Sequence, residues 1–168
     1  AIIVIKSVNF EILEAGIGYI EITGFNETTN KEFDTAMAHM ANNNVKKLIV
    51  DVRNNPGGLL GTGIYISDYF IKPGDDIVKI DYKNKTDRVY KAKTAKAPMD
   101  LVVLVNEGSA SASEIFAGSI KANKAGTLIG AKTFGKGTVQ DSIPLTNGGG
   151  LKITIAEYLL KGDTKVHG

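Results

Sequence analysis

LIVDVRNNPGG, residues 48–58, places a continuous apolar run directly before a polar turn. The run at 48–52 shows no alternation of apolar and polar residues, which is typical of a strand buried on both faces of a parallel sheet. The Asn, Pro and Gly residues that follow turn the chain, and residues 59–71 then have the composition of a helix. The stretch predicts a strand, a turn and a helix in succession, which is the repeating unit of an α/β protein.

A second stretch, VLVNEGSASASE at residues 103–114, repeats this order. It joins a predicted buried strand at 101–105 to a predicted helix at 113–123. In open α/β sheets, sites gather at the carboxyl ends of the strands. We therefore expect the two strand-to-helix junctions to face one crevice.

The remaining segments fit a layered α/β domain with β-hairpin additions. Thr29 and Glu32 have the spacing of a capping box for a helix that ends at the asparagines 42–44. The other predicted elements are strands at 10–13 and 17–23, a hairpin at 77–92, and short strands at 127–130, 138–145 and 151–160.

Composition narrows the possible functions. The 168 residues carry 20 basic and 18 acidic side chains, so the net charge of +2 favours neither nucleic acid nor an anionic membrane as a partner. The absence of cysteine excludes disulfides, zinc–thiolate sites and a cysteine nucleophile. No targeting segment or membrane-length apolar run is present. We expect neither a metal nor a cofactor, and the function must be argued from a local site.

GAKTFGKGT, residues 130–138, is a near match to a phosphate-binding loop. Gly130, Gly135 and Lys136 are in register, but Gly137 stands where the magnesium-binding hydroxyl would be. A phosphate loop needs a helix after it so that backbone amides face the phosphates, whereas TVQDSIPL predicts a strand. Phosphate binding is therefore disfavoured, and Lys136 requires another explanation.

Three serines, Ser109, Ser111 and Ser113, follow the second buried strand and are candidate nucleophiles. The alternative is that they only cap the next helix, because serine is a common N-cap residue. Neither histidine suits a Ser-His-Asp triad, since His39 falls within an amphipathic helix and His167 is the penultimate residue.

A lysine base remains as an alternative to histidine. It requires an environment that favours the neutral amine near working pH. Lys136 fits this better than the other lysines, because it lies between Phe134 and Val139 in a glycine-flanked turn. The alternative reading of Lys136 is an ordinary solvated charge.

Several motifs in the same order resemble the carboxyl-terminal processing peptidases, also called tail-specific proteases. They are VDVRNNPGG, VVLVNEGSASASEIFAG, GAKTFGKGTVQ and LKITIAEYLL, and the resemblance runs from Ile17 to the end of the chain. It implies an α/β fold with a layered ββα core of the crotonase and Clp-protease type. It also implies residues 1–16 as a linker and strand following a missing PDZ domain, and residues 17–168 as the catalytic core, truncated at both ends.

The resemblance implies a serine endopeptidase that cleaves proteins at or near their C-terminal tails through an acyl-enzyme. Ser111 matches the nucleophile, Lys136 the general base, and Gln140 the residue that helps to hold the lysine. The backbone amides of Gly57 and Ala112 match the oxyanion hole. Partners would be protein or peptide substrates, and the setting would be extracytoplasmic, in the periplasm, the cell-wall space or the thylakoid lumen.

By this resemblance the chain departs from the family's pattern in three places: at Ala122, in the missing PDZ domain and in the terminal segment, which stops early. Ala122 stands where some members have an acidic residue, and Asp51 and Arg53 are expected to stabilise a turn rather than to act on substrate. A non-enzymatic peptide-binding or scaffold module on the same fold is the main alternative. A crotonase-like acyl-CoA enzyme is a third hypothesis, which the Ser–Lys pair disfavours. Substrate identity and oligomeric state are not specified.

Overall fold

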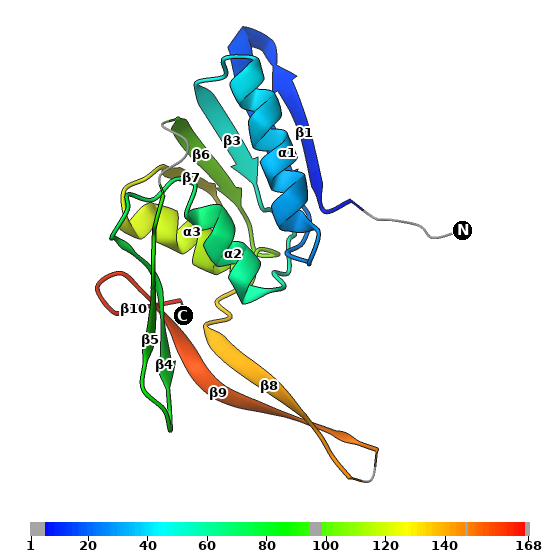
Figure 1. Cartoon of the computed structure of the whole chain (residues 1–168), viewed down its shortest axis with the longest axis vertical. Coiled ribbons are helices and arrows are strands. Elements are labelled where there is room, and N and C mark those ends of the chain that lie inside the picture. The colour runs from blue at the N-terminus through cyan, green and yellow to red at the C-terminus, as the bar shows by residue number, and fades with distance from the viewer. Residues whose placement is uncertain (1–5, 95–98, 147, 167–168) are drawn as a thin grey trace.

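The computed structural model describes residues 6–94, 99–146 and 148–166. The upper part of the molecule in Figure 1 contains a five-stranded sheet in the order β1-β2-β3-β6-β7. Strands β2, β3, β6 and β7 are parallel, and β1 pairs antiparallel with β2 at the edge. The bounds are β1 (Val8–Leu13), the 3-10 turn η1 (Glu14–Gly16), β2 (Ile17–Ile22), β3 (Lys47–Asp51), β6 (Asp100–Val105) and β7 (Thr127–Gly130).

A second sheet lies below the first in Figure 1 and has the order β10-β9-β4-β5. Strand β8 pairs with the first part of β9, and the two form a long ribbon that extends away from the rest of the molecule. The bounds are β4 (Asp76–Tyr82), β5 (Arg88–Lys91), β8 (Thr138–Pro144), β9 (Gly150–Leu160) and β10 (Thr164–Lys165).

Three helices accompany these sheets: α1 (Thr29–Asn42), α2 (Leu60–Ser67) and α3 (Ala112–Ala122). Helix α1 packs against β1 and β2, whereas α3 contacts β7 of the first sheet and both β4 and β9 of the second. Helix α3 therefore forms a layer between the sheets, and most of its side chains are buried. The prediction of a layered α/β domain with hairpin additions is confirmed.

The predicted capping box at the start of α1 is wrong. Thr28, not Thr29, is the N-cap residue, and its hydroxyl donates to Glu32 Oε1 over 2.7 Å. Glu32 Oε2 instead accepts hydrogen bonds from the backbone N–H groups of Ser7, at 2.8 Å, and Val8, at 3.0 Å. The carboxylate thus anchors the segment entering β1, which is a tertiary contact that a local motif cannot reveal.

Helix α2 is shorter than the predicted segment 59–71, because it ends at Ser67. The N–H groups of Tyr69 and Phe70 bond to carbonyls three residues back, at 3.2 and 3.1 Å, which tightens the chain into a turn. This turn brings both aromatic rings against Phe33 of α1, with ring centroids 5.3 and 6.3 Å away. Aromatic packing between the helices therefore accompanies the end of α2.

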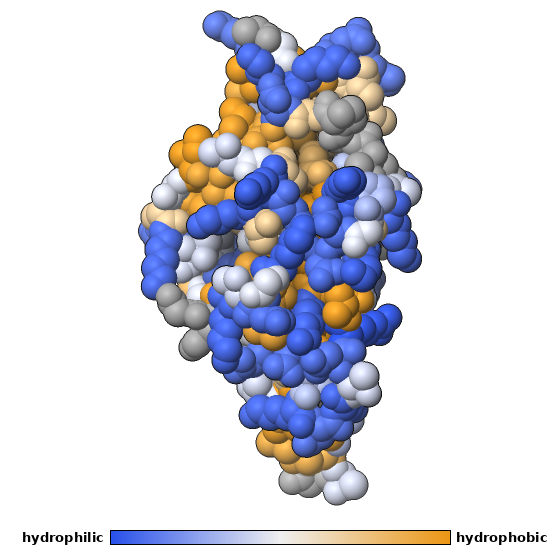
Figure 2. All heavy atoms as spheres, turned by 90° about the vertical axis from the view of Figure 1, so that its left-hand side faces the viewer, coloured by the Kyte–Doolittle hydropathy of each residue, from blue (hydrophilic) through white to orange (hydrophobic). Residues whose placement is uncertain are grey.

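The surface in Figure 2 is hydrophilic over most of its lower part, with hydrophobic residues gathered in its upper part and smaller hydrophobic patches below the centre and near the lower end. Within residues 6–94, 99–146 and 148–166, no helix is long and apolar enough to cross a membrane.

Candidate active site

The loops that follow β3 and β6 are held together at the carboxyl ends of their strands. We call them the β3 loop (residues 52–59) and the serine turn (residues 106–111). Asn54 N–H donates to Asn106 Oδ1 at 2.8 Å, and Asn106 Nδ2 donates back to Asn54 Oδ1 at 2.9 Å. Ser109 Oγ also donates to the Val52 carbonyl at 2.7 Å. The prediction that both junctions face one place is confirmed.

The three candidate serines differ in accessibility. Ser109 and Ser113 have no exposed surface, and the Ser113 hydroxyl donates to the Asn55 carbonyl at 2.9 Å. Both hydroxyls therefore donate to backbone carbonyls of the β3 loop. Ser111 is partly exposed and lies at the N-cap of α3 with φ 56° and ψ −113°, a conformation that is costly for a residue with a Cβ. Of the three serines, Ser111 is thus the one that a substrate could reach.

Backbone donors surround Ser111. The Ala112 N–H, in the first turn of α3, donates to none of the residues that the structure describes, and the N-terminus of a helix favours negative charge. Gly57 has φ +96°, and a Cβ there would lie 2.5 Å from the Ala110 carbonyl oxygen. Only glycine allows this approach. The Gly57 N–H donates to Asn55 Oδ1 at 2.9 Å.

Glu114 is a site residue that the sequence reasoning missed. Its carboxylate is 3% exposed and accepts backbone hydrogen bonds from Ser111 at 2.9 Å, Gly135 at 2.6 Å and Lys136 at 2.8 Å. The spacing Ser111-x-x-Glu114 is that of a capping box, a signal that could have found it. One carboxylate therefore joins the serine turn to residues 131–137, which we call the lysine loop.

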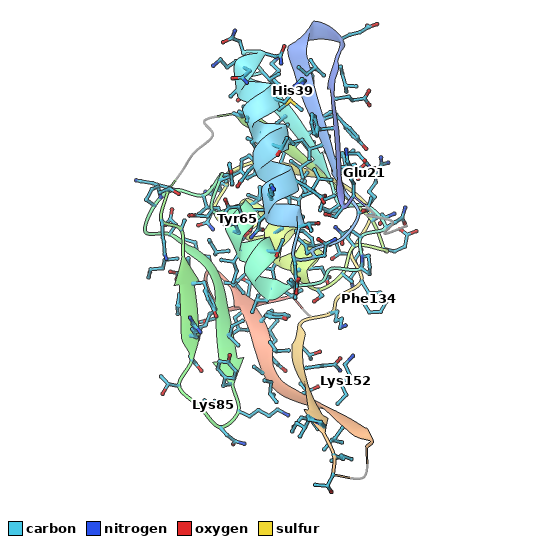
Figure 3. The ribbon with its side chains drawn as sticks, turned by 45° about the vertical axis from the view of Figure 1, so that its right-hand side comes forward. Glu21, His39, Tyr65, Lys85, Phe134 and Lys152 are labelled. Carbon is cyan, nitrogen blue, oxygen red and sulfur yellow. The ribbon has the colours of Figure 1, made fainter. Side chains whose placement is uncertain are left out.

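The lysine loop lies beside the serine turn, and no hydrogen bond joins the described side chains of Ser111, Lys136 and Gln140. The Phe134 N–H donates to the Ser109 carbonyl at 3.0 Å, and Figure 3 places Phe134 where the upper part of the molecule meets the ribbon. Lys136 is half-buried, and its ammonium makes no hydrogen bond or ion pair with a described residue. Gln140 is exposed on β8, opposite Thr154, and does not contact Lys136 through a hydrogen bond.

Asp51 and Arg53 form the stabilised turn that was expected. Asp51, at the end of β3, is 2.6 Å from Arg53 Nη2 and accepts a hydrogen bond from Tyr19 Oη at 2.7 Å. Burial opposes ionisation of Asp51, but the hydrogen bonds from Arg53 and Tyr19 outweigh it and lower the pKa of the carboxyl. Burial, together with the Asp51 contact, raises the pKa of Tyr19 to about 12.

Histidine takes no part in this arrangement among the described residues. The His39 ring packs against Phe10 of β1 at a centroid distance of 5.3 Å and lies toward the upper end of α1 in Figure 3. His167 lies outside the described residues.

The chain is similar to a known protein family and to several known proteins. The family model described as Peptidase family S41 matches residues 16–168. The chain is 40% identical over 164 residues to the carboxy-terminal processing protease CtpA of Bacillus subtilis (strain 168), covering 97% of this chain and 35% of that protein. It is 36% identical to a probable CtpA-like serine protease of Staphylococcus aureus (strain bovine RF122 / ET3-1), covering 98% of this chain and 34% of that protein.

Among solved structures, the photosystem II D1 C-terminal processing protease matches with a TM-score of 0.86 and 30% identity. The match covers 98% of this chain and 46% of that chain. The sequence spans about a third of the length of the two bacterial relatives, from Bacillus subtilis and Staphylococcus aureus.

Proposed function

Because the chain belongs to peptidase family S41, we propose that it is the catalytic core of a serine endopeptidase that cleaves proteins at or near their C-terminal tails. In this proposal Ser111 is the nucleophile and Lys136 is the general base. The observation that supports it most directly is the position of Ser111: a partly exposed residue, on strained backbone, at the N-terminus of a buried helix.

The chemistry proceeds by acyl transfer. Ser111 Oγ attacks the carbonyl carbon of the scissile peptide bond while its proton moves to the neutral Lys136 amine. The C–N bond then breaks, and the Lys136 ammonium gives the proton to the leaving amine. A water molecule, deprotonated by Lys136, hydrolyses the resulting ester, which releases the carboxyl-terminated product and restores the Ser111 hydroxyl.

The oxyanion formed in each step would be stabilised by backbone donors. The Ala112 N–H fits this role because it donates to none of the described residues and lies at a helix N-terminus. The Gly57 N–H would join it by exchanging the Asn55 side chain for the substrate oxygen. A substrate that supplies a better-aligned, negatively charged acceptor favours this exchange.

Formation of the dyad requires movement of the Lys136 side chain. Its backbone N–H is already held by Glu114, so we expect the side chain to rotate toward Ser111 while the lysine loop keeps its path. We propose that Gln140 then hydrogen-bonds to the amine without adding a charge. The names of the relatives lead us to propose protein tails as substrates. The extracytoplasmic setting is proposed from the family resemblance of the motifs.

Two substitutions test the proposed dyad in the full-length protein. Ser111→Ala and Lys136→Ala should each reduce peptide hydrolysis by at least about a thousandfold, because each removes a group that takes part in bond making. The measurements are the rate of hydrolysis of a tail peptide and labelling by a fluorophosphonate probe, with the labelled residue identified by mass spectrometry.

Lys132→Ala is the matched control, because Lys132 is exposed on the same loop and should keep the wild-type rate. Circular dichroism checks that each variant folds. Hydrolysis retained by either dyad variant, or wild-type protein that binds the peptide without being labelled, would contradict the proposal and support a binding module instead.

A further inference from the structure

Phe134 of the lysine loop is a large apolar side chain that is exposed to solvent beside the candidate site. Its exposed fraction of 69% is the largest among the exposed large hydrophobic residues of the described ranges, and Ile129 follows with 54%. A single exposed apolar residue on a protein surface needs no explanation. Phe134 is different because of its position, since it lies two residues before the proposed base, Lys136.

The backbone around Phe134 is fixed to the elements that carry the proposed nucleophile. The Phe134 N–H donates to the Ser109 carbonyl at 3.0 Å. The N–H groups of the next two residues donate to the Glu114 carboxylate at 2.6 and 2.8 Å. Both acceptor residues lie within three positions of Ser111 in the sequence. The point from which the Phe134 ring extends is therefore set relative to Ser111.

The ring itself is available for contact with another molecule. Phe134 belongs neither to the buried hydrophobic core of the described residues nor to the apolar side chains packed against that core. Figure 3 shows it where the upper part of the molecule meets the ribbon. Covering an exposed phenyl ring with another apolar group is favourable, because it removes apolar surface from water. The ring is thus suited to bind an apolar side chain next to the site.

The position of Phe134 in the lysine loop indicates which part of a substrate it would meet. In the proposed mechanism Lys136 gives its proton to the leaving amine, so the carboxyl-terminal fragment lies on the side of Ser111 that faces the lysine loop. An extended peptide advances by only about 3.3 Å per residue. The first residue after the scissile bond is therefore within reach of a phenyl ring that is attached two residues before the base.

We propose that Phe134 is a specificity-determining residue, whose ring contacts an apolar side chain on the first residue after the scissile bond. This inference rests on the proposed function. The substrates would be protein tails that carry a residue such as Leu at that position. An Asp there would lose hydration without gaining a partner, and its carboxylate would meet the negative face of the ring.

Two peptides test this role in the full-length protein. A tail peptide that the wild type cleaves is mapped by mass spectrometry, and versions with Leu or Asp directly after the cleaved bond are compared by kcat/KM. Phe134→Ala should lower kcat/KM for the Leu peptide by about tenfold and change that for the Asp peptide little. Phe134→Leu should recover much of the preference, because it keeps an apolar side chain. The rate of Ser111 labelling by a fluorophosphonate, which carries no peptide leaving group, should not change.

Val89→Ala is the matched control, because Val89 is also exposed, at 44%, but lies on β5 in the second sheet. It should keep the wild-type preference. If Phe134→Ala keeps that preference as well, the role of Phe134 is wrong and the proposed function stands. A lower melting temperature with an unchanged preference would likewise overturn the inference, since the ring would then pack within the full-length protein. If the wild type is neither labelled nor active on the peptides, the proposed function itself fails.

Discussion

At the scale of single residues, the candidate site depends on side chains that hold backbone groups in place. Glu114 is the clearest example, because its buried carboxylate accepts N–H groups from the serine turn and from the lysine loop. Burying a carboxylate is costly unless such donors compensate it. Its two oxygens thus link the serine turn to the lysine loop.

Glu114→Gln should destabilise the protein by about 2 kcal/mol and slow fluorophosphonate labelling at least about tenfold, because the amide nitrogen cannot accept the hydrogen bond that an oxygen accepted. Chemical denaturation and the labelling rate measure the two effects. Glu107→Gln, at an exposed position of the serine turn, is the control and should change neither. Wild-type labelling by Glu114→Gln would show that this link is dispensable.

At the scale of elements, the site depends on how neighbouring strands end together. Tyr19 of β2 and Asp51 of β3 lie on paired parallel strands, and Arg53 closes the turn after them. Because the folded-state pKa of Asp51 is below its usual 3.8, this carboxyl stabilises the fold fully at pH values above 3.8. The stabilisation is lost as the pH falls through the lower, folded-state pKa.

Arg53→Gln should therefore destabilise the protein at pH 7, and the difference from wild type should shrink below about pH 4 as Asp51 takes up a proton. Unfolding free energies from urea titrations at pH 7 and pH 3 measure the difference. Arg88→Gln provides the comparison, because Arg88 stacks on Tyr90 and has no ion pair among the described residues. An Arg53→Gln effect that is equal at both pH values would show that Asp51 is not its origin.

At the scale of the whole molecule, the strands at the centre of the first sheet are buried, whereas the ribbon formed by β8 and the first part of β9 is exposed to solvent. Leu48, Val50 and Val103 of the first sheet are almost completely buried, whereas residues 150–154 of β9 are exposed along the ribbon. The amide hydrogen bonds of buried strands open only when the protein unfolds globally, whereas those of an exposed strand pair open by local unfolding.

Hydrogen exchange should reflect this difference. Amides of β3 and β6 should exchange slowest, and those of residues 151–154 should exchange at least about a hundredfold faster, because opening the ribbon exposes little apolar surface. Exchange followed by mass spectrometry or NMR gives the comparison. Equal protection of the ribbon and β3 would indicate that another surface covers the ribbon.

Much of this architecture follows from local patterns. The apolar runs at 48–52 and 101–105 specified buried parallel strands, and the polar turns after them predicted the two junctions that the structure brings together. The family resemblance drawn from the motifs is confirmed by the match to peptidase family S41. The roles of Ser111, Lys136 and Gln140, and of the Gly57 and Ala112 amides, remain predictions.

The sequence by itself determined the fold class, the family and the short set of candidate residues, because these depend on periodicity, turns and motifs that lie within one segment. Only the tertiary structure decided which serine is accessible, because the Ser109 and Ser113 hydroxyls are buried and donate hydrogen bonds to carbonyls of the β3 loop. It also placed the Glu114 carboxylate between the serine turn and the lysine loop. Those contacts join distant segments, and their geometry depends on how α3 packs between the two sheets, which no local pattern contains.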